Sequence, residues 1–269
     1  MFHVPDVLAP VHRWSLRDAM SSPPADPDEH RASPPLPGIS GLIDALRFVR
    51  YGAPEIGNWA LYLPVIGLGF GIVWVAVDRA LASTAGPGAR SLAVVLVAAA
   101  VTRARPLSAL GRLLAAMPRQ GMARLATREP ARGAVGFACT VAVVAAEAVA
   151  LSALGRYRIV GLLAAPVLGC CSMVVLVVGS RAARADGRRV KFAPAVTFRE
   201  FGLATTATFA VLFWATDFLG LLLMVATAVC TIAARVGWHR WWGGVDETAV
   251  LATSEAIQCV VLLLLAALA

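Results

Sequence analysis

The chain has 269 residues, and its composition excludes a soluble globular domain. Hydrophobic residues make up 59% of the chain and charged residues 15%, whereas soluble domains contain roughly 45–50% apolar and about 25% charged residues. The formal net charge is +8. Because nearly all basic residues are arginines in short segments between apolar runs, this charge indicates membrane orientation and no nucleic-acid partner. We therefore predict an all-α, polytopic transmembrane helical bundle.

We predict that residues 1–40 form a disordered, proline-rich cytoplasmic tail in front of a membrane domain at residues 41–269. This stretch holds eight of the sixteen prolines. A segment of that composition buries too little apolar surface to offset its loss of conformational entropy.

About seven spans are expected, since a helix needs roughly 17–25 apolar residues to cross the bilayer. The predicted spans are 58–78, 91–102, 134–154, 159–179, 201–216, 217–234 and 248–268. The second is too short to cross alone, so it either dips into the membrane as a half-helix or borrows residues 103–114. The fifth and sixth share one apolar run, which we divide near Asp217.

The distribution of Lys and Arg predicts the orientation of these spans. Twenty of the 24 basic residues fall in residues 1–57, ahead of the first predicted span, and in the loops 103–133, 180–200 and 235–247. The opposite loops hold Arg79, Arg90, Arg156 and Arg158. Because cytoplasmic loops carry the excess of basic residues, we predict a cytoplasmic N-terminus and a C-terminus on the other side.

Few polar groups fall inside the predicted spans. Glu147 lies within the third span, where a charged group is costly and is a functional candidate. It is either protonated, facing a polar cavity, or hydrogen-bonded between helices. The five cysteines lie in apolar runs without His at zinc-ligand spacing, so we predict neither disulfides nor a zinc site.

A short leucine-rich segment at 106–117 is expected to lie on the membrane surface. Four arginines lie within or after this segment. These arginines are Arg112, Arg119, Arg124 and Arg128. Guanidinium groups match the geometry of phosphate, so these side chains can bind a phosphate ester. Alternatively, they anchor the loop to anionic lipid.

Carboxylates in three predicted cytoplasmic loops are candidates for a magnesium site. Magnesium favours carboxylates combined with substrate phosphates. Glu129, Asp186 and Asp246 are the candidate ligands, and Glu129, Asp246 and Glu247 are the candidate catalytic residues. The alternative is that these side chains only solvate the cytoplasmic face.

Several blocks of sequence, in order over residues 38–268, resemble the cobalamin synthase family, the adenosylcobinamide-GDP ribazoletransferases of the bacterial inner membrane. The similar blocks are Asp44 to Arg50, Leu63 to Gly67, Arg128 to Gly136, Ala164 to Leu168, Ala183-Arg184 with Asp186-Gly187, and Gly243 to Val245 with Glu255. The resemblance implies a multi-pass protein of that membrane. The candidate substrate-binding residues are Arg47, Arg112, Arg128 and Arg184.

The chain departs from this family at its signature, Leu-His-Leu-Asp-Gly-Leu-Ala-Asp-Thr-Ala-Asp-Gly. The corresponding segment is Arg105 to Ala116. Aligned without gaps, the three aspartates become Ser108, Arg112 and Ala115, and the histidine becomes Pro106. The resemblance implies that those aspartates hold Mg²⁺, so we expect the metal site to be lost or rebuilt.

The reaction implied by the resemblance joins α-ribazole, or its phosphate, to adenosylcobinamide-GDP with release of GMP. The leading interpretation is a divergent or catalytically impaired family member in corrinoid nucleotide-loop assembly. A second is an enzyme with a relocated metal site at Glu129, Asp186, Asp246 and Glu247. A third is a non-catalytic membrane scaffold or binding protein for a corrinoid, a nucleotide or another corrinoid-assembly protein. Transport is a fourth, for which only Glu147 offers a polar group. The sequence leaves open whether the chain is an active transferase.

Overall fold

The computed structural model describes residues 39–52, 59–116, 130–180, 184–185, 188–189 and 196–269. It is helical apart from one two-residue antiparallel pair, β1 (Arg184–Ala185) and β2 (Arg188–Arg189). The all-α bundle predicted from composition is therefore confirmed. Nearly all of the predicted N-terminal tail lies outside the described residues.

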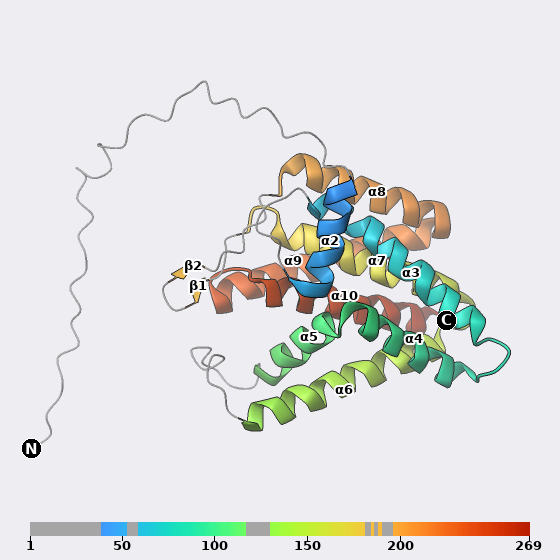
Figure 1. Cartoon of the computed structure of the whole chain (residues 1–269). Coiled ribbons are helices and arrows are strands. Elements are labelled where there is room, and N and C mark those ends of the chain that lie inside the picture. The colour runs from blue at the N-terminus through green and yellow to red at the C-terminus, as the bar shows by residue number, and fades with distance from the viewer. Residues whose placement is uncertain (1–38, 53–58, 117–129, 181–183, 186–187, 190–195) are drawn as a thin grey trace, which may run out of the picture. The chain divides into compact units, whose positions relative to one another are not determined.

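The helices follow one another along the chain as shown in Figure 1. In order they are α2 (Ile39–Tyr51), η1 (Trp59–Tyr62), α3 (Leu63–Ala80), α4 (Pro87–Thr102), α5 (Arg105–Ala116), α6 (Pro130–Ala153), η3 (Gly155–Tyr157), α7 (Arg158–Val177), α8 (Phe198–Thr216), α9 (Phe218–Trp242) and α10 (Glu247–Leu268).

Five helical segments among the described residues are long and apolar enough to cross a membrane. They are Trp59–Ala80, Gly133–Ala153, Gly155–Val177, Phe218–Trp242 and Glu247–Leu268. The bent pair α4 and α5 makes a sixth if it counts as one span. The protein is thus a multi-pass membrane protein with five or six candidate spans, where the sequence predicted about seven. The difference is α8, whose 19 residues include Arg199, Glu200 and four threonines, which lower its hydropathy.

Helix α7 forms the centre of the bundle. In the apolar 18-residue stretch of the segment Gly155–Val177, which contains α7, 78% is buried inside the protein. In the apolar 18-residue stretch of α9, only 22% is buried. Helix α7 packs against α3, α8, α9 and α10. Small residues permit the closest of these approaches, because a Cβ on Gly67 of α3 would lie 2.6 Å from the carbonyl oxygen of Pro166. Because so little of it is buried, helix α9 lies at the outside of the bundle.

The short second span ends in a sharp bend. Helices α4 and α5 meet at 98°, and the two residues between them, Arg103 and Ala104, have φ angles of 57° and 53°. Left-handed backbone ends a helix, since residues other than glycine rarely continue it in that conformation. The sequence predicted a half-helix or an extension through 103–114, and the structure has a 16-residue helix followed by a bent continuation.

The long apolar run after residue 198 is divided at Asp217, as predicted. Asp217 has a φ of 49° and separates α8 from α9. At the other end of α8, the hydroxyl of Thr197 accepts the Glu200 N–H, and the Glu200 carboxylate accepts the Thr197 N–H. This capping box fixes where α8 begins.

A buried ion cluster joins three helices at one end of the bundle, here called the Asp78 end. Asp78 is 3% exposed and accepts hydrogen bonds from Arg90 of α4 and Arg158 of α7. The Nη2 atoms of these arginines lie 2.7 and 2.6 Å from its carboxylate oxygens. The cluster therefore fixes the end of α3 against the starts of α4 and α7.

Candidate functional site

The opposite end of the bundle, here called the Arg105 end, brings together residues that the sequence singled out in separate segments. Arg105, the first residue of α5, forms an ion pair with Glu247, the first residue of α10. Its Nη1 also donates to the carbonyl oxygen of Phe48 in α2 at 2.9 Å. Arg105 thus links α2, α5 and α10.

The backbone conformation at this junction favours glycine at Gly52, which follows α2. Gly52 has a φ of 117°, a region that residues with a Cβ rarely adopt. A Cβ there would lie 3.3 Å from Oε1 of Glu247. The glycine lets the end of α2 approach the Arg105–Glu247 ion pair directly.

Asp246 has a structural partner next to this ion pair. Its Oδ1 accepts a hydrogen bond of 2.7 Å from the backbone N–H of Ala249. Asp246 is therefore the N-cap of α10, where a carboxylate also interacts favourably with the helix dipole.

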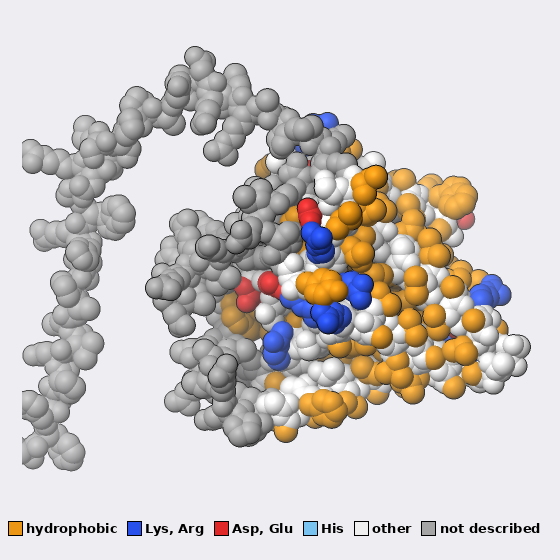
Figure 2. All heavy atoms as spheres, viewed as in Figure 1, with side chains coloured by type: hydrophobic (Ala, Val, Ile, Leu, Met, Phe, Trp, Pro, Cys, Tyr) orange, Lys and Arg blue, Asp and Glu red, His pale blue; other side chains and the backbone are white. Residues whose placement is uncertain are grey.

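Basic side chains gather on one face of the molecule, as Figure 2 shows, and several arginines lie on the helices that meet at the Arg105–Glu247 ion pair. Arg103 lies over the ring of Tyr51, with its guanidinium carbon 4.8 Å from the ring centroid. Arg47 is 66% exposed and lies 3.8 Å from Asp44, a solvated pair of little strength. Arg112 is exposed about two turns along α5 from Arg105. We refer to Arg47, Arg103, Arg105 and Arg112 as the arginine cluster.

The predicted site residues divide into those that the structure describes and those that it does not. Asp246 and Glu247 lie beside Arg105, and Arg47 and Arg112 belong to the arginine cluster. Glu129, Arg128 and Asp186 lie outside the described residues, and of Arg184 only the backbone in β1 is described. Their roles as ligands or catalytic residues stay predictions. The sequence reasoning did not single out Arg105 as the partner of Glu247.

The described residues do not fit a magnesium ion. Helix α5 carries Ser108, Arg112 and Ala115 and no carboxylate, and the Ser108 hydroxyl donates to the Arg105 carbonyl oxygen at 3.0 Å. Glu247 is neutralised by Arg105, and Asp246 is engaged by the start of α10. Among the residues with described positions, no group of three His, Cys, Asp or Glu side chains could hold a metal.

Sequence comparison assigns the family. The protein-family model described as cobalamin-5-phosphate synthase matches residues 43–266, which includes all or most of every helix that reaches the Arg105 end. The chain belongs to this family. Membership makes it a membrane protein of the transferase type found in cobalamin biosynthesis, whose members act on corrinoids.

A curated relative is consistent with this assignment. Over 220 residues the chain is 29% identical to an adenosylcobinamide-GDP ribazoletransferase of Geotalea daltonii, covering 80% of this chain and 88% of the relative. No solved structure matches the chain.

Proposed function

We propose that this protein binds a nucleotide-activated corrinoid at the membrane during cobalamin nucleotide-loop assembly, and that it has lost the metal-dependent transfer step. The observation that carries this proposal is the pairing of Glu247 with Arg105 at the start of α5. Where the family resemblance calls for three carboxylates, α5 offers Ser108, Arg112 and Ala115. Metal-assisted phosphoryl transfer needs a cation to neutralise developing charge, and an arginine at this position repels that cation.

The arginine cluster supports substrate binding. Exposed guanidinium groups bind the pyrophosphate of a nucleotide diphosphate through charge-assisted, paired hydrogen bonds. Arg47 and Arg112 are exposed on two adjacent elements at the Arg105 end. Arg105 is already engaged by Glu247 and Phe48, so its role is to position α5 against α2 and α10.

Binding is tested on the purified full-length protein in detergent, titrated with adenosylcobinamide-GDP. Replacing Arg47 and Arg112 together by Ala should weaken binding at least about tenfold, because hydrogen bonds to charged groups contribute about 1.5–3 kcal/mol. The matched control is Arg79→Ala, which removes an exposed arginine near the Asp78 end.

Turnover is tested in the same preparation with α-ribazole and Mg²⁺. We expect no product above background, and no rescue of a strain that lacks cobalamin synthase. Clear activity that Glu129→Ala or Asp246→Ala abolishes would establish a relocated-site enzyme instead. Absence of both binding and activity would favour the scaffold, which holds a partner protein of corrinoid assembly.

A further inference from the structure

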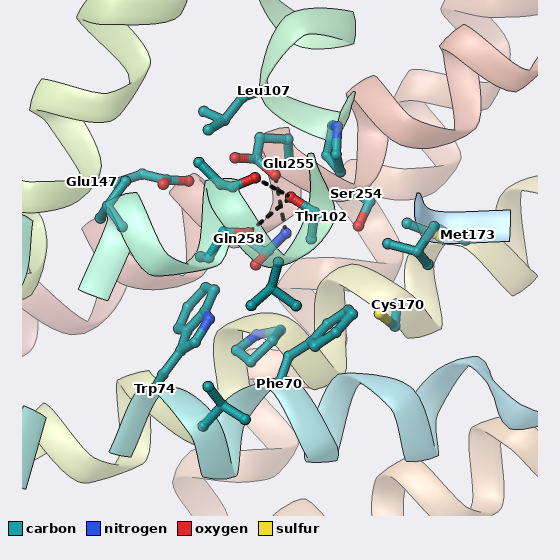
Figure 3. Close-up of a pocket in the computed structure, with 18 residues that line it drawn as sticks. Phe70, Trp74, Thr102, Leu107, Glu147, Cys170, Met173, Ser254, Glu255 and Gln258 are labelled. Carbon is teal, nitrogen blue, oxygen red and sulfur yellow. Dashed lines mark hydrogen bonds between the residues drawn. The ribbon is translucent and has the colours of Figure 1, made fainter. Parts of the chain in front are cut away.

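A small cavity lies inside the bundle beneath the α4–α5 bend, apart from the arginine cluster. Its volume is about 30 Å³, which exceeds the roughly 10–15 Å³ that a cavity needs to hold a water molecule. Helices α2, α3, α4, α5, α6, α7 and α10 all contribute to its lining. Figure 3 shows Glu147 of α6, and Glu255 and Gln258 of α10, around this cavity, with Trp74 and Phe70 of α3 below them.

Two carboxyl groups line the cavity with few hydrogen bonds. Glu147 and Glu255 are 5% and 7% exposed. Oε1 of Glu147 accepts from the Cys259 thiol at 3.2 Å, and Oε2 of Glu255 accepts from the Gln258 amide at 3.2 Å. Within the described part of the chain, the second oxygen of each carboxyl has no hydrogen-bond donor.

Among the described residues, no basic side chain forms an ion pair with either of these two groups. The residues that line the cavity include no Lys, Arg or His. The other titratable groups nearby are two thiols: Cys170 of α7 lines the cavity, and Cys259 of α10 donates to Glu147. Bare carboxylates at this depth are costly, and two of them close together repel each other. The pair therefore needs positive charge from outside the protein.

The cavity limits the kind of cation. Magnesium keeps an octahedral shell of about six oxygens, and among the described residues no group of three His, Cys, Asp or Glu side chains could hold it here. A proton needs no shell. Sodium can shed its water where carboxyl, amide and hydroxyl oxygens are present, and Ser254 adds a hydroxyl to the lining.

We propose that Glu147 and Glu255 form an intramembrane site that exchanges one monovalent cation, a proton or Na⁺. One carboxyl stays neutral. The other binds the exchangeable cation through the oxygen that accepts no hydrogen bond. Pro106 and Leu107 of α5 line the same cavity, so binding of the cation should affect the geometry of the bend next to Arg105. The proposal does not rest on the proposed function, because it concerns different residues.

The test follows thermal unfolding of the full-length protein in detergent, with Na⁺ exchanged for choline and with pH varied. If Na⁺ is the cation, it should raise the melting temperature saturably by about 3 °C, and less at lower pH, since protons compete. If the proton is the cation, lowering pH should stabilise the protein and Na⁺ should have no effect. Mg²⁺ should have no effect beyond ionic strength in either case.

Glu147→Gln and Glu255→Gln should each remove the response, because the amide has nearly the same shape but cannot take up the cation. The matched control is Asp44→Asn, which neutralises an acidic side chain on α2 outside the cavity. Wild type and both Gln variants responding identically to pH and Na⁺ would overturn the proposal.

A measurement on the wild-type protein tests the site even if the Gln variants do not fold. Infrared spectroscopy should show a buried carboxyl band, slow to exchange in D₂O, that titrates with pH or shifts with Na⁺. A spectrum with no such band under any of these conditions would also overturn the site.

Discussion

Asp246 illustrates how a residue with the chemistry of a metal ligand can have a structural role. Its carboxylate accepts the Ala249 N–H at the start of α10. We expect Asp246→Ala to lower the free energy of unfolding by about 1 kcal/mol, and Asp246→Asn to leave it nearly unchanged, because Asn is as good an N-cap as Asp. Chemical denaturation of the detergent-solubilised variants measures both. Equal losses for the two variants would show that the charge matters more than the cap.

Asp78 is the residue on which the ion cluster at the other end of the bundle depends. Replacing it by Asn leaves the guanidinium groups of Arg90 and Arg158 without their counter-charge. Removing one partner of a buried ion pair costs about 3–5 kcal/mol, so Asp78→Asn should lower the melting temperature strongly. Asp44→Asn is the matched control, since Asp44 has only a distant, solvated partner. An effect of Asp78→Asn no larger than this control contradicts the structure at this end.

Sequence reasoning identified individual residue types better than their partners. Asp246, Glu247 and the arginines were predicted as candidates from charge and position. The Arg105–Glu247 ion pair joins residues 142 positions apart, and hydrophobic periodicity carries no information about such distant pairs. The Cys259–Glu147 contact, across 112 positions, was missed for the same reason.

At the scale of elements, the contact between α3 and α7 depends on the spacing Gly67-x-x-x-Gly71. Small residues at this spacing allow two membrane helices to approach closely. On Gly67 a Cβ would lie 2.8 Å from the Cα of Val167, which is backbone that cannot turn away. On Gly69, in the same helix, a Cβ would meet nothing within 4 Å.

We therefore expect Gly67→Ala to lower the free energy of unfolding by about 1–3 kcal/mol, the usual cost of overpacking. Gly69→Ala should be neutral or slightly stabilising, because Ala is the better helix former. Thermal unfolding of both variants in the same detergent measures the difference. Similar melting temperatures would mean that α3 and α7 do not pack as closely as described.

Element boundaries were predictable where the chain has strong local signals. The capping box at Thr197 and the polar break at Asp217 are local, and the division at Asp217 was predicted. The 98° bend after α4 was foreseen only as a choice between two interpretations. Left-handed backbone at Arg103 and Ala104 has no glycine to mark it in the sequence, so local propensity could not locate the bend.

At the scale of the whole bundle, contacts between helix ends decide whether α8 crosses the membrane. The Asp78 cluster places the start of α7 at the Asp78 end, so α7 finishes at the Arg105 end. The Arg105–Glu247 pair places the start of α10, and with it the nearby end of α9, at the Arg105 end as well. Helix α9 must then begin at the Asp78 end, at Asp217. Helix α8 connects these two ends, so we predict that it crosses despite its lower hydropathy.

The C-terminus follows from the same contacts. A Cβ on Gly155 would lie 4.0 Å from Cβ of Ala269, and Gly155 precedes Arg158 by only three residues. Figure 1 shows the C-terminus at the same end of the bundle as the loop between α3 and α4. If α8 crosses and the bent pair counts as one span, the number of crossings is seven.

The final prediction is that reporter fusions will place Asp217 and Ala269 outside the cytoplasm and Gly243 inside it. Twenty of the 24 Lys and Arg residues lie in residues 1–57 and in the three loops predicted to be cytoplasmic, and such an excess marks the cytoplasmic side. The four remaining arginines, Arg79, Arg90, Arg156 and Arg158, all lie near the Asp78 end. A fusion within the tail serves as the cytoplasmic control. Cytoplasmic signal at Asp217 would show that α8 lies on the membrane surface and that the bundle has at most six crossings. Signal at Ala269 on the same side as the tail would contradict the odd number of spans.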